Sequence, residues 1–243
     1  DVSTSTSADW SFWNVDNRRA FVELSHGFDN GWQTKAVYNF IDTRQDSRLF
    51  YMYGTPDKTT GEGLMSYPGL YQMHMKQHVG DVNASGPFRL LGREHQMVVG
   101  STLSRSTVNE LSLYSNDIGT ALPPLENWDG SYTQPAFDLY PNGSYWNDQE
   151  MAGYLAARFS VIDDLTWIVG SRLTSWETNG QSYGVAKTNS AHGVLTPYTG
   201  LVYDLTDAIS TYASYTTIFT PQKAMDINRQ QLDPIDGISY ETG

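Results

Sequence analysis

The chain of 243 residues contains no cysteine, which excludes a disulfide framework and thiolate metal sites. It also lacks any window near the ~18 consecutive apolar residues that a membrane-spanning helix needs, and its mean hydropathy is −0.45. Basic residues are few: the chain has 15 Lys and Arg but 27 Asp and Glu, which gives a formal net charge of −12. Because such a chain repels polyanions on average, nucleic-acid binding is excluded.

The first residues, DVSTSTSADW, have neither the basic region nor the apolar run of a signal peptide. We therefore expect either that such a signal has been removed or that the chain is a piece of a longer protein. No stretch shows the 3.6-residue period of an amphipathic helix.

Aromatic residues are abundant, at 13% of the chain, and the periodic segments alternate with period two. Between residues 32 and 42, Trp32, Tyr38 and Phe40 share one parity and Lys35 and Asn39 the other. This alternation predicts an all-β chain with strands at about 18–28, 32–43, 75–87, 95–106, 150–161, 165–177, 194–204 and 209–219, and a further one beginning near Ile238.

The connections between these strands alternate in length. FDNGW, residues 28–32, is typical of a tight Asn-Gly hairpin, and the connections near 88–95, 161–167 and 203–210 are also short. Long polar connections fall at about 43–74, 107–149, 178–193 and 220–237. In an up-and-down meander this places all short turns at one end, as in transmembrane β-barrels with short periplasmic turns and long extracellular loops.

A secreted β-sandwich or propeller that binds carbohydrate through its aromatic rings stays open as an alternative, because soluble strands alternate equally well. A third possibility is an outer-membrane enzyme. The histidines and loop carboxylates show no triad pattern, and His74 and His78 would stand roughly 13 Å apart on one strand, too far to share an ion.

Five ordered blocks carry a family resemblance: ADWSFWNVDNRRAFVELSHGFDNGW, SGPFRLLGREHQMVVG, AGYLAARFSVIDDLTWIVGSRL, LTPYTGLVYDLTDAISTYASYTTIFTPQ and LDPIDGISYETG. In these blocks the chain resembles the TonB-dependent outer-membrane receptors for ferric siderophores, and within them the receptors for ferric pyoverdine and ferric coprogen. The resemblance implies a transmembrane antiparallel up-and-down β-barrel. Residues 1–243 would supply about eight or nine strands of a barrel of about 22, with the plug domain and the TonB box absent from the chain.

The resemblance implies that the protein is a transporter and not an enzyme. It would bind a ferric siderophore at the bacterial outer membrane and import it in a TonB-dependent manner. No cofactor and no metal site of the protein is expected, because the siderophore itself holds the iron. The implied partners are the siderophore, TonB acting through the missing plug, and outer-membrane lipid, and the receptor is expected to be a monomer.

The resemblance also implies a ligand pocket built from residues near the extracellular strand ends. Trp13 aligns with a pocket position, and Tyr51 and Tyr53 follow the second strand, where the family places an aromatic pocket residue. In the family, the segment after Pro221-Gln222 also contributes to the ligand pocket. In this chain, Met225, Asp226 and Arg229 stand roughly where some relatives have aromatic or hydroxyl side chains. The full set of candidate ligand-binding residues is Trp13, Tyr53, Trp10, Tyr51, Met225, Asp226 and Arg229.

Overall fold

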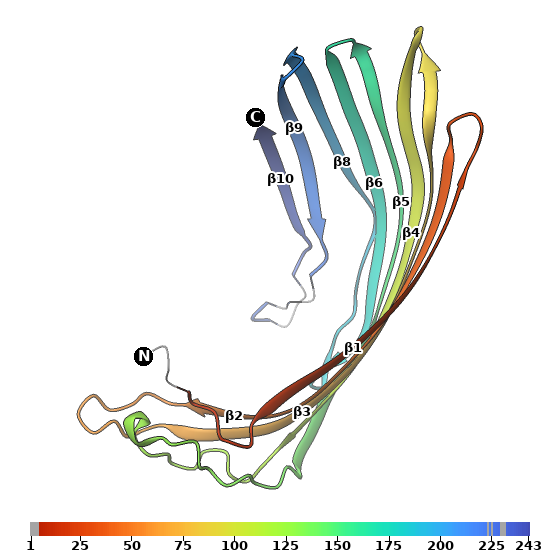
Figure 1. The fold of residues 1–243 in the computed structure, drawn as a ribbon. Helices are drawn as coiled ribbons and strands as arrows, with labels where there is room; N and C mark the ends of the chain where they lie inside the picture. The colour runs from red at the N-terminus through yellow and green to blue at the C-terminus, as the bar shows by residue number, and fades with distance from the viewer. Residues whose placement is uncertain (1–4, 223, 225, 229–231) are drawn as a thin grey trace.

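The computed structural model describes residues 5–222, 224, 226–228 and 232–243. One curved antiparallel sheet makes up nearly all of it (Figure 1). Its strands are β1 (Phe12–Gly27), β2 (Gln33–Tyr53), β3 (Met65–Leu90), β4 (Arg93–Tyr114), β5 (Leu139–Ile162), β6 (Leu165–Ser182), β7 (Val185–Ala186), β8 (Asn189–Thr206), β9 (Ile209–Thr220) and β10 (Ile235–Thr242).

Each long strand pairs with its neighbours in sequence, so the order is β1-β2-β3-β4-β5-β6-β8-β9-β10, with the short β7 paired to β6. The turns at one end are tight, as between β3 and β4, where Leu91 and Gly92 take positive φ values of 51° and 79°. Positive φ at both central residues is the geometry that matches the twist of a two-residue hairpin. The longer connections all gather at the opposite end (Figure 1). This meander confirms the all-β barrel architecture predicted from the sequence and does not support the sandwich or propeller.

The strands run further than the sequence predicts. Much of 43–74 and the two ends of 107–149, expected as loops, belong to β2, β3, β4 and β5, and the true connections are 54–64 and 115–138. The prediction was wrong there because alternation of polar and apolar residues marks a strand only where one face is buried. In these outer strand segments both faces carry polar side chains.

The half of the sheet near the tight turns has two chemically different faces. One face carries apolar rows that continue from strand to strand, such as Val22, Tyr38, Leu103 and Met151. Their side chains are about half exposed or more, 57% for Val22 and 59% for Met151. We call it the outer face. It is the convex side of the curved sheet, where side chains diverge and are left uncovered.

The opposite, inner face is polar and its side chains converge. The phenol of Tyr154 on β5 donates to Asp81 on β3 at 3.0 Å, across the intervening β4, and Asp81 also accepts from Thr102 at 2.8 Å and Asn83 at 2.9 Å. Arg172 pairs with Glu150 at 2.7 Å on the same face. An apolar outside and a polar inside are what a barrel in a lipid layer requires.

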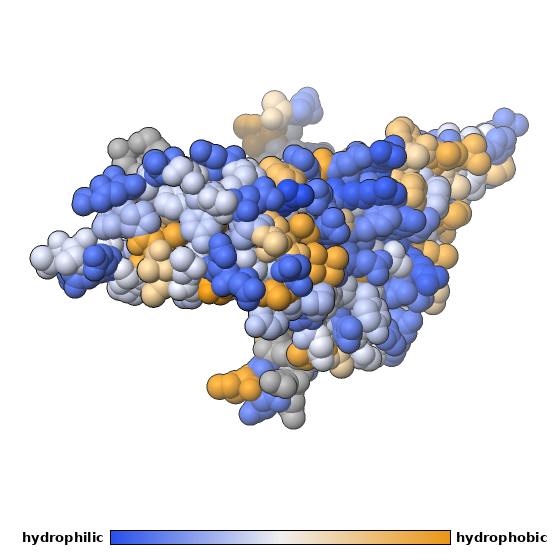
Figure 2. All heavy atoms as spheres, turned by 90° about the horizontal axis from the view of Figure 1, so that it is seen from below, coloured by the Kyte–Doolittle hydropathy of each residue, from blue (hydrophilic) through white to orange (hydrophobic). Residues whose placement is uncertain are grey.

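A small apolar core lies at the end with the long connections. The connection 115–138, with its one 3-10 turn Leu125–Asn127, packs on the outer face of β2, where Phe50 is buried. Seen from this end, the surface is mostly hydrophilic, with hydrophobic side chains in separate patches (Figure 2). Among the described residues, no helix is long and apolar enough to cross a membrane.

Because Gly100 on β4 has no side chain, the Tyr154 ring can occupy the space above it. A Cβ at Gly100 would come within 2.4 Å of the Tyr154 ring and hydroxyl, whereas a Cβ at Gly200, also on the inner face, would meet only ordinary contacts from 3.5 Å. We expect Gly100→Ala in the full-length protein to displace Tyr154 from Asp81 and to lower the free energy of unfolding by about 1–3 kcal/mol. The measurement is the unfolding temperature in detergent, with Gly200→Ala as the matched control. Equal unfolding temperatures for the two variants would contradict the role assigned to this contact.

Candidate functional site

Beyond the apolar half of the sheet, the inner face carries a cluster of aromatic side chains. The antiparallel register brings them together: Trp13 is opposite Ser47, Tyr51 opposite Tyr67, and Tyr71 opposite Ser112. Cross-strand partners of an antiparallel pair point to the same face, so strands distant in sequence contribute to one surface. We call this surface the aromatic wall; its members are Trp13, Tyr51, Tyr53, Tyr67, Tyr71, Tyr114 and Tyr183.

The tyrosines of the wall contact one another edge to face. Ring centroids lie 6.1 Å apart for Tyr53 and Tyr67, 5.8 Å for Tyr67 and Tyr114, and 6.2 Å for Tyr71 and Tyr114, with interplanar angles of 78–84°. This geometry is the favourable arrangement of aromatic quadrupoles. The wall is therefore held by its own contacts.

Tyr183 reaches the wall from the turn between β6 and β7. Its phenol is hydrogen-bonded to the buried Ser112 hydroxyl at 2.9 Å, and its backbone N–H donates to the carbonyl of Gly143 at 3.0 Å. The residue has a positive φ of 49°, uncommon outside glycine, so its surroundings hold it in a strained conformation.

A pocket of about 220 Å³ opens on this wall. Trp13, Tyr51, Tyr71 and Tyr183 line it, with Glu110 as the carboxylate on its border. The rings of Trp13, Tyr51 and Tyr183 are 60%, 48% and 45% exposed, which leaves their faces available to a ligand. Flat apolar surfaces with a few polar groups are the usual lining of a small-molecule site.

Tyr71 is the most enclosed phenol of the wall. Burial raises its pKa, and the neighbouring phenols of Tyr114, Tyr67, Tyr51 and Tyr183 raise it further. Burial likewise raises the pKa of Tyr114. Both phenols therefore stay protonated at neutral pH, so the wall presents neutral hydroxyls that can donate hydrogen bonds.

The structure brings three of the candidate residues to this wall. Trp13 and Tyr51 line the pocket together, and Tyr53 stands at the end of the tyrosine cluster, in contact with Tyr67. Asp226 lies in the connection between β9 and β10, where it accepts from the backbone N–H of Asn228 at 2.9 Å. Met225 and Arg229 lie outside the described residues.

Trp10 lies elsewhere, in the apolar core on the outer face. Its indole N–H donates to the carbonyl of Tyr132 at 2.8 Å, and its ring packs edge-on against Phe50 and Phe137 at 6.0 and 5.9 Å. The structure therefore does not join Trp10 to the pocket that Trp13 lines, although only two residues separate them in the sequence.

Four members of the wall were not among the residues predicted from the sequence: Tyr67, Tyr71, Tyr114 and Tyr183. Tyr67 and Tyr71 are in a segment interpreted as a loop, although their spacing of four residues places them on one face of a strand. That spacing, together with Tyr51 and Tyr53 on the preceding strand, was the signal from which the sequence could have predicted that Tyr67 and Tyr71 belong to the wall.

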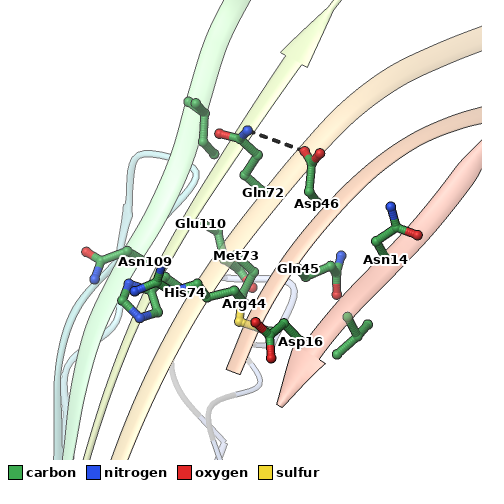
Figure 3. A pocket seen from close by; sticks show the side chains of 12 residues that line it. Asn14, Asp16, Arg44, Gln45, Asp46, Gln72, Met73, His74, Asn109 and Glu110 are labelled. Carbon is green, nitrogen blue, oxygen red and sulfur yellow. Dashed lines mark hydrogen bonds between the residues drawn. The ribbon is translucent and has the colours of Figure 1, made fainter. Parts of the chain in front are cut away.

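A larger groove lies on the other face. It measures about 710 Å³ and is lined mainly by polar side chains of β1 to β4, including Asp16, Arg44 and His74 (Figure 3). Gln72 donates to Asp46 at 3.4 Å there, and His74 contacts the Asp42 carboxylate at 3.2 Å. Neither this groove nor any other part of residues 5–222 gathers three metal-ligating His, Asp or Glu side chains.

Comparison with known proteins identifies the family. All 243 residues match the family model described as TonB dependent receptor-like, beta-barrel. The ferric-pyoverdine BN7/BN8 receptor of Pseudomonas putida is 37% identical over 256 residues, which cover 99% of this chain and 31% of that protein. The ferripyoverdine receptor of Pseudomonas aeruginosa is 33% identical over 253 residues, covering 100% of this chain and 30% of that protein.

Solved structures agree in fold. The crystal structure of the ferripyoverdine receptor of the outer membrane of P. aeruginosa bound to ferripyoverdine superposes with a TM-score of 0.90 at 32% identity, over 100% of this chain and 32% of that one. The chain thus spans about a third of the length of the relatives it matches. The chain belongs to the TonB-dependent receptors, as a part of their outer-membrane β-barrel.

Proposed function

We propose that this chain is the part of an outer-membrane receptor that presents an aromatic ligand-binding wall for a ferric siderophore, which the whole protein imports with the help of TonB. The observation that carries the proposal is the convergence of Trp13, Tyr51, Tyr71 and Tyr183 on one inner-face pocket. The two relatives that are 37% and 33% identical to the chain, over 31% and 30% of their own length, are receptors for ferric pyoverdines.

The chemistry of the wall fits a ligand whose iron is already fully coordinated. A ferric siderophore needs flat surfaces against its chelate and hydrogen-bond donors toward its oxygens, not metal ligands from the protein. The neutral phenols of the wall supply both, and Glu110 offers an acceptor for an ammonium or amide group. The receptor makes and breaks no bond in this function.

The pocket of about 220 Å³ is smaller than a drug-sized site of 300–1,000 Å³. We propose that further ligand contacts come from the connection between β9 and β10, which includes Asp226, and from barrel strands beyond β1 and β10. We also propose that the plug domain and the TonB box, which the family uses to release ligand inward, lie outside residues 1–243, and that the full-length receptor acts as a monomer.

Replacing Trp13 by alanine should weaken binding of ferric pyoverdine to the full-length receptor by about 10- to 100-fold, because a large exposed ring is lost from the pocket. Titration with ferric pyoverdine, followed by quenching of tryptophan fluorescence, measures the dissociation constant. Trp167→Phe, which alters a ring on the outer face near the tight turns, is the control and should bind as the wild type does. Unchanged affinity and unchanged quenching in Trp13→Ala would overturn the proposal.

The effect of the Tyr71 ring position on ligand affinity can be tested with variants that keep every aromatic ring. A Cβ at Gly69 would lie 2.5 Å from the Tyr71 hydroxyl, so Gly69→Ala should tilt this ring out of the wall and weaken ligand binding about tenfold. Tyr71→Phe keeps the ring in place and should change the affinity by no more than about threefold, since a single neutral hydrogen bond contributes little net free energy. The same titration compares the two variants. A larger loss in Tyr71→Phe than in Gly69→Ala would show that the hydroxyl, and not the shape of the wall, governs binding.

A further inference from the structure

Glu110 is an isolated charge on the inner face beside the aromatic wall. It lies on β4, two residues before Ser112, and it borders the pocket that Trp13 and Tyr71 line. Its side chain is partly buried. Within the part of the chain that the structure describes, Glu110 forms no ion pair and its carboxylate has no hydrogen-bond partner. A partly buried carboxylate in this state is stabilised by a cation that a ligand brings to it.

The inner-face rows of β1 to β5 around Glu110 carry no other charged side chain. Its own cross-strand row consists of Val15, Gln45, Met73 and Ser144. The row toward the long connections consists of Trp13, Ser47, Tyr71 and Ser112. The row toward the tight turns consists of Asn17, Thr43, Met75, Val108 and Trp146. A cation beside this last row, Lys187, lies over the Trp146 ring, 3.7 Å from its centroid, and forms no ion pair with Glu110.

The rings near Glu110 turn the pocket into a cage for a positive charge. The phenol of Tyr183 is hydrogen-bonded to Ser112 at 2.9 Å, which brings its ring next to the row of Glu110. The rings of Trp13, Tyr51 and Tyr183 are about half exposed or more. The face of an aromatic ring is negative and attracts a cation within about 6 Å of its centroid. An anionic group is repelled both by these faces and by Glu110.

The pocket has room for a side group of a siderophore and not for the whole chelate. Its volume of about 220 Å³ lies below the roughly 300–1,000 Å³ of a site for a drug-sized molecule. A flexible arm that ends in an ammonium or guanidinium group suits both parts of the lining. Its methylene stem packs against the rings, while its charged end reaches the carboxylate.

We propose that the aromatic wall selects siderophores that carry a cationic side group, and that Glu110 is the residue that determines this selectivity. The inference rests on the proposed receptor function. The cation donates to the Glu110 carboxylate and lies against the Tyr183 ring, its stem follows Trp13 and Tyr51, and the ferric chelate stays outside the pocket. The net charge of −12 on this chain also favours the approach of a cationic ligand.

The test compares three ferric pyoverdines on the purified full-length receptor in detergent, by quenching of tryptophan fluorescence. The first carries one free side-chain amine, the second is the same molecule with this amine acetylated, and the third has the amine succinylated, which replaces the positive charge by a carboxylate. The wild type should bind the amine form about 10- to 100-fold more tightly than the acetylated form, the range of a hydrogen bond between charged groups. The succinylated form should bind most weakly.

Variants of Glu110 separate its charge from its shape. Glu110→Gln keeps the shape and should bind the amine and acetylated forms within about threefold of each other. Glu110→Lys should reverse the order and prefer the succinylated form. The matched control is Glu94→Gln, which removes an exposed carboxylate with the same parity on the same strand near the tight turns, and it should keep the wild-type preference. The unfolding temperature of Glu110→Gln should not fall below that of the wild type, because Glu110 has no partner to lose.

Two outcomes would refute the inference and leave the receptor function standing. One is equal affinity of the wild type for the amine and acetylated forms, and the other is an unchanged preference for the amine form in Glu110→Gln. Failure of the wild type to bind any of the three ferric pyoverdines would instead count against the receptor function itself, and against this inference with it.

Discussion

The structure depends on one constraint: backbone N–H and C=O groups in a lipid layer must be paired within the protein, since no water is available to them. The chain meets it with an almost unbroken ladder, in which β3 and β4 alone pair from Gly69 and Tyr114 to Leu90 and Arg93. Most register shifts fall close to strand ends, as between Ser160 and Ile162 beside a tight turn, whereas the shift between Thr174 and Trp176 lies in the middle of β6. Once the register is set, the parity of a residue decides whether it meets lipid or the interior.

Parity also explains how one sheet carries two surfaces of opposite chemistry. On β3, Tyr67 and Tyr71 have odd numbers and build the inner wall, while Lys76 and His78 have even numbers and face outward. Glycines complete the inner surface where a ring needs room: Gly69 lies beneath the Tyr71 hydroxyl and Gly100 beneath the Tyr154 ring. Each of these rings occupies the space that a Cβ would need, so the absence of a side chain at the glycine is what allows the ring its position.

The sequence predicted the architecture well because the apolar half of the sheet shows its alternation openly, as in Trp32, Tyr38 and Phe40. It predicted strand ends poorly, because beyond the apolar layer both faces mix polar and apolar side chains and the period of two is lost. Tyr67 and Tyr71 were hidden in such a segment. Trp10 shows a different limit: its direction depends on Phe50 and Tyr132, which are 40 and 122 residues away, and no local pattern reports such contacts.

The separation of the faces has an energetic consequence. Side chains on opposite faces of a single sheet do not touch, and substitutions without shared contacts have additive effects on free energy. Changes on the outer face, as at Leu103, therefore leave Tyr71 on the inner face undisturbed, even though the backbone ladder joins their strands. Coupling would require a shift of the ladder itself, and the unbroken pairing of β3 with both β2 and β4 opposes that shift. A rigid sheet with two independent faces allows the chemistry of the aromatic wall to change while the outer face keeps its own.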